Sequence, residues 1–421
     1  MARNAFYAQS GGVTAVINAS ASGVIETWRH YAQQRPDEIG KLYAGRFGIL
    51  GALTEELIDT THESDEAIAA LAHTPGAVFG SCRYKLSDPA KDRSQYERLI
   101  EVFRAHDIGY FFYNGGNDSM DTALKVSEIA AEMNYPIHCI GIPKTIDNDL
   151  VETDCCPGFG SAAKYVAVAM REAMRDVEAM AGTSTRVFVM EVMGRHVGWL
   201  TAAASLAAEA GGPPILLLLP EVPFNERAFI DRVSACVTKH ECCLIAVSEG
   251  LRDGNDRLLG DTGHLDAFGH AQLGGIGARI AELVRGLLGY KVHWALPDYL
   301  QRSARHLAST TDFLHAQGVG RSAVEMAMQG KSGIMMTVVR HAEHPYSWEI
   351  GTAPLQAVAN REKMLPREFI SDDGFGVSEA CKRYLMPLLD GEEYPPYRNG
   401  LPDYVRFKNV MVEPKLSPFV P

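Results

Sequence analysis

The stretch Pro143-Lys144-Thr145-Ile146-Asp147-Asn148-Asp149 follows a short apolar run, residues 137–142, that has the length and composition of a buried strand. A parallel strand that ends in a lysine and two aspartates places charge where such sheets open onto their ligands. Two carboxylates this close repel each other when both are ionised, so the pair needs a cation, a hydrogen-bond donor or a shared proton. A base for a sugar hydroxyl and a site for phosphate can both be built here, although Asp and Asn are also ordinary turn formers.

Two further predicted strands end in a glycine pair in front of a predicted helix. Gly11-Gly12 follows the strand-like residues 5–8, and Gly115-Gly116 follows residues 109–114, which are rich in β-forming aromatic side chains. A glycine pair lets the backbone approach a ligand closely, and the helix that follows offers unpaired N–H groups to an anion. Both strand ends therefore predict sites for phosphate oxygens, although a structural turn is the commoner use of paired glycines.

Polar side chains follow the second glycine pair directly. The oxygens of Asn117 and Asp118 suit Mg²⁺ or, together with Ser119, a phosphate site. Asp118 or Ser119 can equally cap the helix that begins there. Between the two glycine pairs, Arg83 and Lys85 lie beside a Gly-Ser turn, where they form either a phosphate site or a solvated basic loop.

The alternation of predicted strands and helices continues through the second half of the chain. Three polar segments there end strand-like runs, namely Met193-Gly194-Arg195, Ser248-Glu249-Gly250 and Tyr299-Leu300-Gln301-Arg302. Arg195 can bind a phosphate or a carboxylate through two hydrogen bonds, or form an ordinary surface ion pair. Alternation sustained over this length predicts an α/β protein with two doubly wound domains.

The composition limits the classes of function. The 421 residues are 46% hydrophobic and 22% charged, which is typical of a globular protein of two or three domains. A formal net charge of -12 argues against general binding to nucleic acid or membranes, but not against phosphate held by a local cluster of cations. The N-terminus has no apolar signal core, and the 8 cysteines have no zinc-finger spacing. We therefore expect a cytoplasmic protein with reduced thiols.

These motifs, in this order, resemble those of the phosphofructokinase family from about residue 5 to about residue 340. The resemblance implies a phosphofructokinase-like α/β fold, in which two doubly wound, three-layer α/β/α domains hold the active site in the cleft between them. It implies a diphosphate- and Mg²⁺-binding domain of residues 1–165 and 295–335. The second domain, residues 166–294 and 336–421, would bind the sugar phosphate and carry a C-terminal extension.

Within the family, the chain is similar to the diphosphate-dependent branch, because Asp118 and Lys144 stand where ATP-using relatives have glycines. An Asp118 carboxylate would occupy and repel the region that a nucleotide α-phosphate needs, and Lys144 would supply a cation to diphosphate. The resemblance implies reversible, Mg²⁺-dependent transfer of a phosphoryl group from diphosphate to the 1-hydroxyl of fructose 6-phosphate. The products would be fructose 1,6-bisphosphate and phosphate, as in glycolysis and gluconeogenesis.

Three alternatives stay open at this point. The chain can be an ATP-dependent 6-phosphofructokinase, or a kinase that prefers another ketose phosphate such as sedoheptulose 7-phosphate. It can also be a non-catalytic phosphate-binding protein on the same scaffold, although the intact set of Asp147, Asp149, Lys144 and Arg195 argues against that.

The resemblance also assigns roles to individual residues. Asp147 would take the proton from the sugar hydroxyl, and the other expected catalytic residues are Lys144, Asp118, Arg195 and Asp149. The expected contacts to fructose 6-phosphate are Thr145, Ile146, Asp147, Met193, Gly194, Arg195, Glu249, Tyr299, Leu300, Gln301, Arg302, Arg186 and Lys291. The expected contacts to diphosphate are Gly11, Gly12, Arg83, Gly116, Lys144 and Ser119, and the expected magnesium ligands are Asn117 and Asp118.

Some positions depart from the family pattern. Asn117 stands where the family usually has an aspartate, and Tyr299 replaces the histidine of many ATP-using relatives. Lys291 or His293 would replace a phosphate-binding arginine. Arg186 matches a position that reaches the sugar phosphate of a neighbouring subunit in relatives, which implies a homodimer or a homotetramer.

Overall fold

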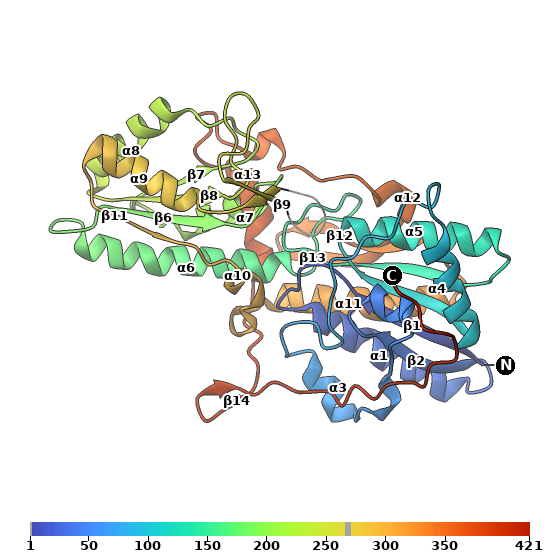
Figure 1. The fold of residues 1–421 in the computed structure, drawn as a ribbon. Helices are drawn as coiled ribbons and strands as arrows, with labels where there is room; N and C mark the ends of the chain where they lie inside the picture. The colour runs from blue at the N-terminus through green and yellow to red at the C-terminus, as the bar shows by residue number, and fades with distance from the viewer. Residues whose placement is uncertain (1, 266–270) are drawn as a thin grey trace.

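A seven-stranded sheet and a four-stranded sheet organise the computed structural model, which describes residues 2–265 and 271–421 (Figure 1). In spatial order, the larger sheet consists of β13 (Tyr346–Pro354), β12 (Ile334–Glu343), β5 (His138–Pro143), β4 (Ile108–Gly115), β1 (Arg3–Gln9), β2 (Ile39–Gly45) and β3 (Leu57–Asp59). The inner pairings are parallel, whereas β13 and β3 pair antiparallel at the two edges. The inner strands are apolar almost throughout because helices cover both faces of a parallel sheet.

Helices cover the larger sheet in two layers. One layer contains α1 (Ile17–Gln34) and α11 (Thr310–Met328), and the other contains α2 (Ile49–Leu53), α4 (Ser94–Ala105) and α5 (Asn117–Glu132). On the first face, the Trp28 ring packs edge-on against Tyr110 and Phe112. On the second face, Phe103 packs against Phe6 and Phe111. Apolar cores on both faces give this unit its three layers.

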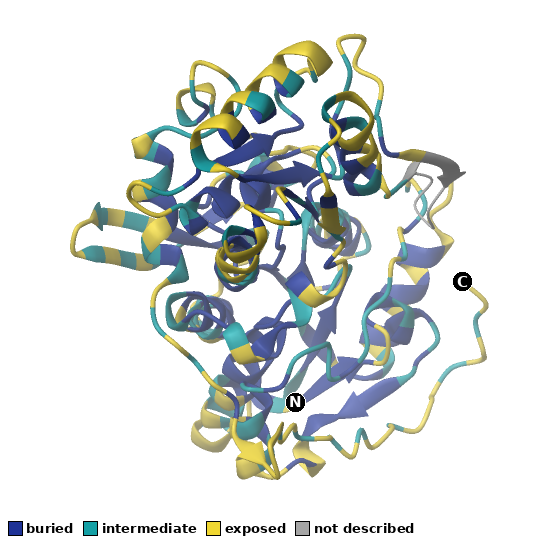
Figure 2. Cartoon of the chain, turned by 90° about the vertical axis from the view of Figure 1, so that its left-hand side faces the viewer, coloured by how far each residue is buried: buried dark blue, intermediate teal, exposed yellow. Residues whose placement is uncertain are grey.

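The four-stranded sheet is parallel throughout. Its strands, in spatial order, are β11 (Val292–Ala295), β6 (Val187–Val192), β8 (Cys243–Ser248) and β7 (Ile215–Leu218). One face packs on α8 (Glu226–His240) and α9 (Ile276–Leu288), and the other packs on α6 (Phe159–Met180) and α7 (Trp199–Ala203). The long helix α6 leads from the larger unit into the smaller one (Figure 1). Figure 2 shows most strands of both sheets as buried, inside a shell of partly exposed helices. The β12–β13 hairpin and β11, at the sheet edges, are partly exposed.

Shorter elements connect these layers. They are α3 (Asp65–Leu71), α10 (Leu300–Ser303), α12 (Leu355–Val358), α13 (Glu379–Leu385), the pair β9 (Asp261–Leu265) and β10 (Ala271–Leu273), the pair β14 (Tyr397–Arg398) and β15 (Leu401–Pro402), and the 3-10 turns η1 (Thr60–His62), η2 (Ala204–Ala207), η3 (Arg305–Leu307), η4 (Arg367–Phe369) and η5 (Met386–Leu389).

The predicted α/β architecture with two three-layer units is confirmed, but one expected boundary differs from the strand pairing. We expected residues 336–421 to continue the second domain. Instead, β12 pairs with β5 in the larger sheet, and its hairpin partner β13 completes that edge. Residues 336–354 therefore belong to the first unit, because a strand follows the sheet that supplies its hydrogen bonds. The rest of the division into two domains stays a prediction.

The last residues of the chain also return to the first unit. The Val412 N–H donates to the Leu57 carbonyl, and the Asp59 N–H donates to the Val410 carbonyl. Among the described residues, the 8 cysteines are free thiols. No helix in the described part of the chain is long and apolar enough to cross a membrane.

Candidate active site

The carboxyl ends of β1, β4 and β5 lie side by side at one edge of the larger sheet. Gln9 pairs with Asn114, and Gly115 pairs with Pro143, so the loops that follow these strands begin next to one another. The Lys144 N–H donates to the Gly115 carbonyl at 3.0 Å. The three predicted segments at 11–12, 116–119 and 144–149 therefore meet, as expected for parallel strands.

Lys144 is the buried cation of this edge. Only 4% of the residue is exposed, and its Nζ donates to the Gly12 carbonyl at 2.7 Å. A Cβ at Gly11 would lie 3.3 Å from that Nζ. The pKa of Lys144 is lowered to about 8, mainly by burial and also by Arg302 and Arg83, while Asp147 and Asp149 oppose the shift. The Gly12 carbonyl thus holds the ammonium group at the glycine pair, in the field of both carboxylates and guanidinium groups.

Arg302 and Arg83 approach Gly12 from the other side. A Cβ at Gly12 would come within 2.5 Å of Arg302 Nη1, so Arg302 would have to shift if this residue were not glycine. Arg83 Nη2 lies 3.9 Å from the same position. The Arg302 guanidinium carbon lies 3.8 Å from the centre of the Tyr299 ring, which orients the side chain. Cations from three separate loops therefore face the backbone of Gly11 and Gly12, an arrangement that suits a polyphosphate anion.

Asp147 is the carboxyl group nearest to this cluster in sequence. Its pKa is raised to about 7, mainly by burial and also by Asp149 and Glu249, while Lys144 and Arg302 oppose the shift. Its N–H donates to Thr145 Oγ1 at 3.0 Å, which fixes the turn that carries it. A carboxylate with a pKa near neutrality is a suitable general base.

Asp149 lies on the far side of a tight turn from Asp147. The residue between them, Asn148, is fully buried and has a left-handed backbone with φ of 56°. Burial raises the pKa of Asp149, and its Oδ1 has no hydrogen-bond partner among the described residues. The two predicted carboxylates are therefore close enough to act on each other, as the sequence indicated.

The second half of the site comes from the ends of β6 and β8 in the smaller sheet. The Gly194 N–H donates to Glu249 Oε1 at 3.2 Å, and Ser248 Oγ donates to the Gly194 carbonyl at 2.6 Å. A Cβ at Gly250 would clash with the Arg195 carbonyl, so the two loops pack backbone to backbone. Burial raises the pKa of Glu249, and the neighbouring Arg195 opposes that shift.

The two halves face each other. Glu249 of the smaller sheet raises the pKa of Asp147, and Arg83 of the larger sheet lowers that of Glu249. The buried side chain of Gln301 joins the segment that carries Arg302 to the end of β6, because it accepts a hydrogen bond from the Met193 N–H at 3.2 Å and donates to the Asp298 carbonyl at 3.0 Å. The site therefore lies between the two sheets. It contains the cation-lined phosphate site, the Asp147 carboxyl group with its raised pKa, and Glu249 with the neighbouring Arg195.

Comparison with known proteins agrees with this geometry. A family model described as phosphofructokinase matches residues 4–327. The chain belongs to the phosphofructokinase family. It is 60% identical over 417 residues to a pyrophosphate–fructose 6-phosphate 1-phosphotransferase of Methylococcus capsulatus, covering 99% of this chain and 98% of the relative. A relative of the same name from Halomonas elongata is 57% identical over 417 residues, covering 99% of each chain.

A solved structure, the pyrophosphate-dependent phosphofructokinase from Nitrosospira multiformis, superimposes on the chain with a TM-score of 0.91. The two are 53% identical, and the match covers 100% of each. The phosphofructokinase fold expected from the motifs is therefore confirmed over the whole chain.

The structure of this phosphofructokinase-family chain gives Asn117 a different environment from the one expected of a metal ligand. Asn117 Oδ1 accepts a hydrogen bond from the Asn360 N–H at 2.6 Å, and its Nδ2 donates to the Arg361 carbonyl. Both polar atoms of the amide thus hold a segment from the C-terminal part of the chain. Asp118, in contrast, is half-exposed, with Oδ1 3.0 Å from the Lys85 Nζ.

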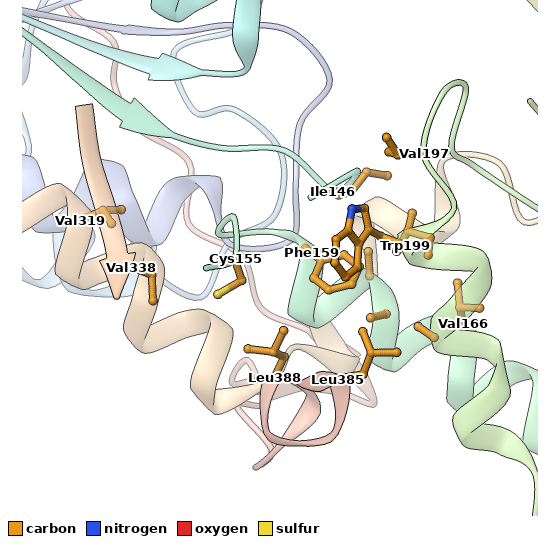
Figure 3. Close-up of a cluster of buried hydrophobic side chains, with 14 of the residues drawn as sticks. Ile146, Cys155, Phe159, Val166, Val197, Trp199, Val319, Val338, Leu385 and Leu388 are labelled. Carbon is orange, nitrogen blue, oxygen red and sulfur yellow. The ribbon is translucent and has the colours of Figure 1, made fainter. Parts of the chain in front are cut away.

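Three other predicted substrate or diphosphate residues are buried in this chain, and a fourth is exposed. Ile146 lies in the apolar core beside Trp199 (Figure 3), and Ser119 is buried next to Gly115. The Gln301 side chain makes the hydrogen bonds to Met193 and Asp298 described above. Leu300 is 61% exposed, whereas Gln301, the next residue of the short helix α10, is 1% exposed.

Arg186 and Lys291 lie at the other edge of the smaller sheet. They precede β6 and β11, whereas Met193 and Glu249 follow β6 and β8. The Arg186 N–H donates to the Lys291 carbonyl, and the Lys291 Nζ donates to Ser184 Oγ at 2.9 Å. A strand the length of β6 separates the two edges by roughly 20 Å. The structure therefore does not bring this exposed pair together with the site of its own chain.

Sequence reasoning missed residues 360–363, which contact the site from the C-terminal part of the chain. The Lys363 N–H donates to the Asp149 carbonyl at 2.7 Å. The Glu362 carboxylate lies 2.9 Å from His196 Nδ1, next to Arg195. No motif marks this segment, because it lies in an irregular stretch without strand or helix periodicity.

Proposed function

We propose that this chain transfers a phosphoryl group reversibly from diphosphate to the 1-hydroxyl of fructose 6-phosphate. The observation that carries the proposal is the buried Lys144 ammonium at the Gly11-Gly12 backbone, with Asp147 of raised pKa beside it. A bare two-phosphate anion needs cations and backbone groups, and an attacking hydroxyl needs a base. The names of the 60% and 57% identical relatives support the same donor and acceptor.

Each residue then contributes to a simple sequence of events. The cations Lys144, Arg83 and Arg302 hold diphosphate and balance the charge that develops during transfer. Asp147 accepts the proton of the sugar 1-hydroxyl as the oxygen attacks the phosphorus. Arg195 lies with Glu249 on the sugar side, where it can bind the moving phosphoryl group. In the reverse direction, Asp147 returns the proton to the sugar oxygen.

Asp118 and Lys144 exclude ATP, which is a bulkier phosphoryl donor than diphosphate. Asp118 lies in the first turn of α5 beside the phosphate site, with its Oδ1 3.0 Å from the Lys85 Nζ. A nucleotide would have to place its α-phosphate near this carboxylate, where repulsion disfavours it. Lys144 meanwhile fills the space next to Gly11. We propose diphosphate as the physiological donor for this reason.

The oxygen atoms of Asn117 and Asp118 fit a magnesium ion only in part. Carboxylate oxygens are the ligands that Mg²⁺ prefers, and the half-exposed Asp118 offers one at the mouth of the phosphate site. Asn117 does not fit as a ligand while both its amide atoms hold residues 360 and 361. We propose that Asp118 and the diphosphate oxygens hold the ion, which would neutralise phosphate charge during transfer.

The assay that tests this proposal uses purified protein, Mg²⁺, fructose 6-phosphate and diphosphate. We expect fructose 1,6-bisphosphate as product, measured by an aldolase-coupled assay, and loss of turnover when EDTA removes Mg²⁺. Restoring Mg²⁺ should restore the rate, which separates metal removal from damage to the protein. Product formation with ATP but none with diphosphate would contradict the proposal, as would a marked preference for sedoheptulose 7-phosphate as acceptor.

We also propose that the active form is a homodimer in the cytoplasm, in which Arg186 and Lys291 reach the sugar phosphate bound by the partner. Both side chains are exposed and far from the site of their own chain. A closed two-fold assembly would give each site an arginine from the other copy.

Mixed dimers test the shared site. Arg186→Ala and Asp147→Asn variants should each be nearly inactive, because one lacks a sugar-phosphate contact and the other lacks the base. Dimers reassembled from an equal mixture should recover about a quarter of wild-type activity, since half are mixed and each mixed dimer has one intact site. Absence of recovery in demonstrated mixed dimers would show that Arg186 does not act across subunits.

A further inference from the structure

Residues 360–363, which we call the bracket, cross the strand ends that form the site. The bracket follows α12 and is fixed at its first residue. The Asn360 N–H is bound by Asn117 Oδ1, and Asn360 Nδ2 donates to Asp121 Oδ1 at 3.0 Å. The start of α5, which carries Asp118, therefore anchors one end of the bracket.

Lys363 forms the centre of the bracket. Its Nζ donates to the Asp154 carbonyl at 2.8 Å, to the Thr153 carbonyl at 3.0 Å and to Asn148 Oδ1 at 3.3 Å. Its backbone N–H donates to the Asp149 carbonyl at 2.7 Å. An ammonium group has three protons to donate, so the three acceptors of the Lys363 Nζ use its full capacity.

The chain that Lys363 binds has little structure of its own. Residues 146–157 form neither helix nor strand, and Asn148 is held in a left-handed conformation that costs free energy outside glycine. Contacts from outside the segment must maintain its shape. Tyr384 binds its Asn148 end, because the Tyr384 hydroxyl accepts from Asn148 Nδ2 at 3.0 Å. Val338 and Arg340 bind residues 153 and 154, and Lys363 contacts both ends through the hydrogen bonds described above.

The far end of the bracket contacts the second half of the site. Trp199 Nε1 donates to the Lys363 carbonyl at 2.9 Å, and the Lys363 ammonium lies 5.5 Å from the centre of the Trp199 ring. Trp199 in turn lies beside Ile146 in the core (Figure 3). The Glu362–His196 pair joins the bracket to the loop that carries Arg195.

We infer that Lys363 is a positioning residue for phosphoryl transfer. It fixes the Asp147–Asp149 turn against the ends of strands from both sheets, so that the base keeps its distance from Lys144 on one side and Arg195 on the other. Lys363 touches neither substrate in this role. The inference rests on the proposed function and gives the C-terminal segment a part in it.

The test compares Lys363→Met with Lys382→Met, a matched control in which the lysine is on the surface and pairs with Glu379. Methionine keeps the length of the side chain but removes the Lys363 donor from the Thr153 carbonyl. Asn148 Oδ1 and the Asp154 carbonyl each lose one donor and keep another, the Cys156 N–H and the Tyr384 hydroxyl. We expect kcat to fall about 100-fold in Lys363→Met, because a small displacement of a catalytic group has effects of that size. KM for both substrates should change less than about threefold, and the control should match the wild type.

Two further variants separate positioning from loss of the fold. Trp199→Phe keeps an aromatic ring at this position but removes the indole hydrogen bond to the Lys363 carbonyl. It should lower kcat roughly fivefold. Adding Lys363→Met to Asp147→Asn should cost little more than Asp147→Asn alone, because both changes act on the same step.

Four outcomes decide between the inference and the proposed function. A kcat in folded Lys363→Met that matches the control, or full additivity in the double variant, would overturn the inference. If Lys363→Met does not fold, an unchanged kcat in Trp199→Phe overturns it instead. A wild-type protein without turnover on diphosphate would overturn the proposed function itself.

Discussion

Asp147→Asn is expected to lower kcat with diphosphate by about 10²- to 10⁴-fold, which is the usual contribution of a general base. The amide has the shape of the carboxyl group and preserves the backbone bond to Thr145, but it cannot take the proton of the sugar hydroxyl. Binding should change little, so the KM for fructose 6-phosphate should stay within a few-fold of the wild type. Steady-state kinetics of the purified variant, with product detected through aldolase, give both values.

The pH dependence of turnover provides the control. The pKa of Asp147 is raised to about 7, so its active, ionised form is present above that pH and is lost as the pH falls. We expect wild-type kcat to fall on the acid side with an apparent pKa near 7, and Asp147→Asn to lack this limb. A variant that retains kcat within about tenfold of the wild type, and keeps the limb, would rule out Asp147 as the base.

Lys144→Met should have the second largest effect. Its ammonium group is buried at the phosphate site, where the absence of water makes a charge more effective than in solution. Removing it leaves Arg302 and Arg83 to balance the diphosphate and the developing charge alone. We expect kcat with diphosphate to fall by about 10²- to 10³-fold, as for other groups that stabilise a transition state.

The alkaline side of the pH profile of kcat also tests whether the charge of Lys144 is needed. Burial lowers the pKa of Lys144 to about 8, so the charged form is lost as the pH rises through that value. Wild-type kcat should therefore decline above about pH 8, and the decline should be absent in Lys144→Met. Equal turnover of the wild type and the variant at neutral pH would show that the charge of Lys144 is not needed.

The parts of the site that lie at strand ends were predictable from sequence, and for a physical reason. Parallel strands all expose their carboxyl ends at one edge, so polar residues after apolar runs had to meet there. Lys144, Gly12 and Asp147 meet in this way. The pairing of Gly194 with Glu249 follows from the same rule in the smaller sheet.

Other features depended on contacts that a strand or loop does not encode by itself. We expected residues 336–421 in the second domain, but which sheet β12 and β13 join depends on the free edge of β5. Asn117 looked like a metal ligand because of its place after a glycine pair, whereas the structure uses its amide to hold residues 360 and 361. Lys363 had no local pattern at all, since the acceptors of its ammonium group are more than 200 residues away in sequence.

The ratio of kcat/KM for diphosphate to kcat/KM for ATP, compared between the wild type and an Asp118→Gly, Lys144→Gly double variant, tests the central claim most directly. The claim is that this carboxylate and this ammonium group together admit diphosphate and exclude a nucleotide. We predict a ratio strongly in favour of diphosphate in the wild type and a large shift toward ATP in the double variant. An unchanged ratio in a folded double variant would contradict the claim.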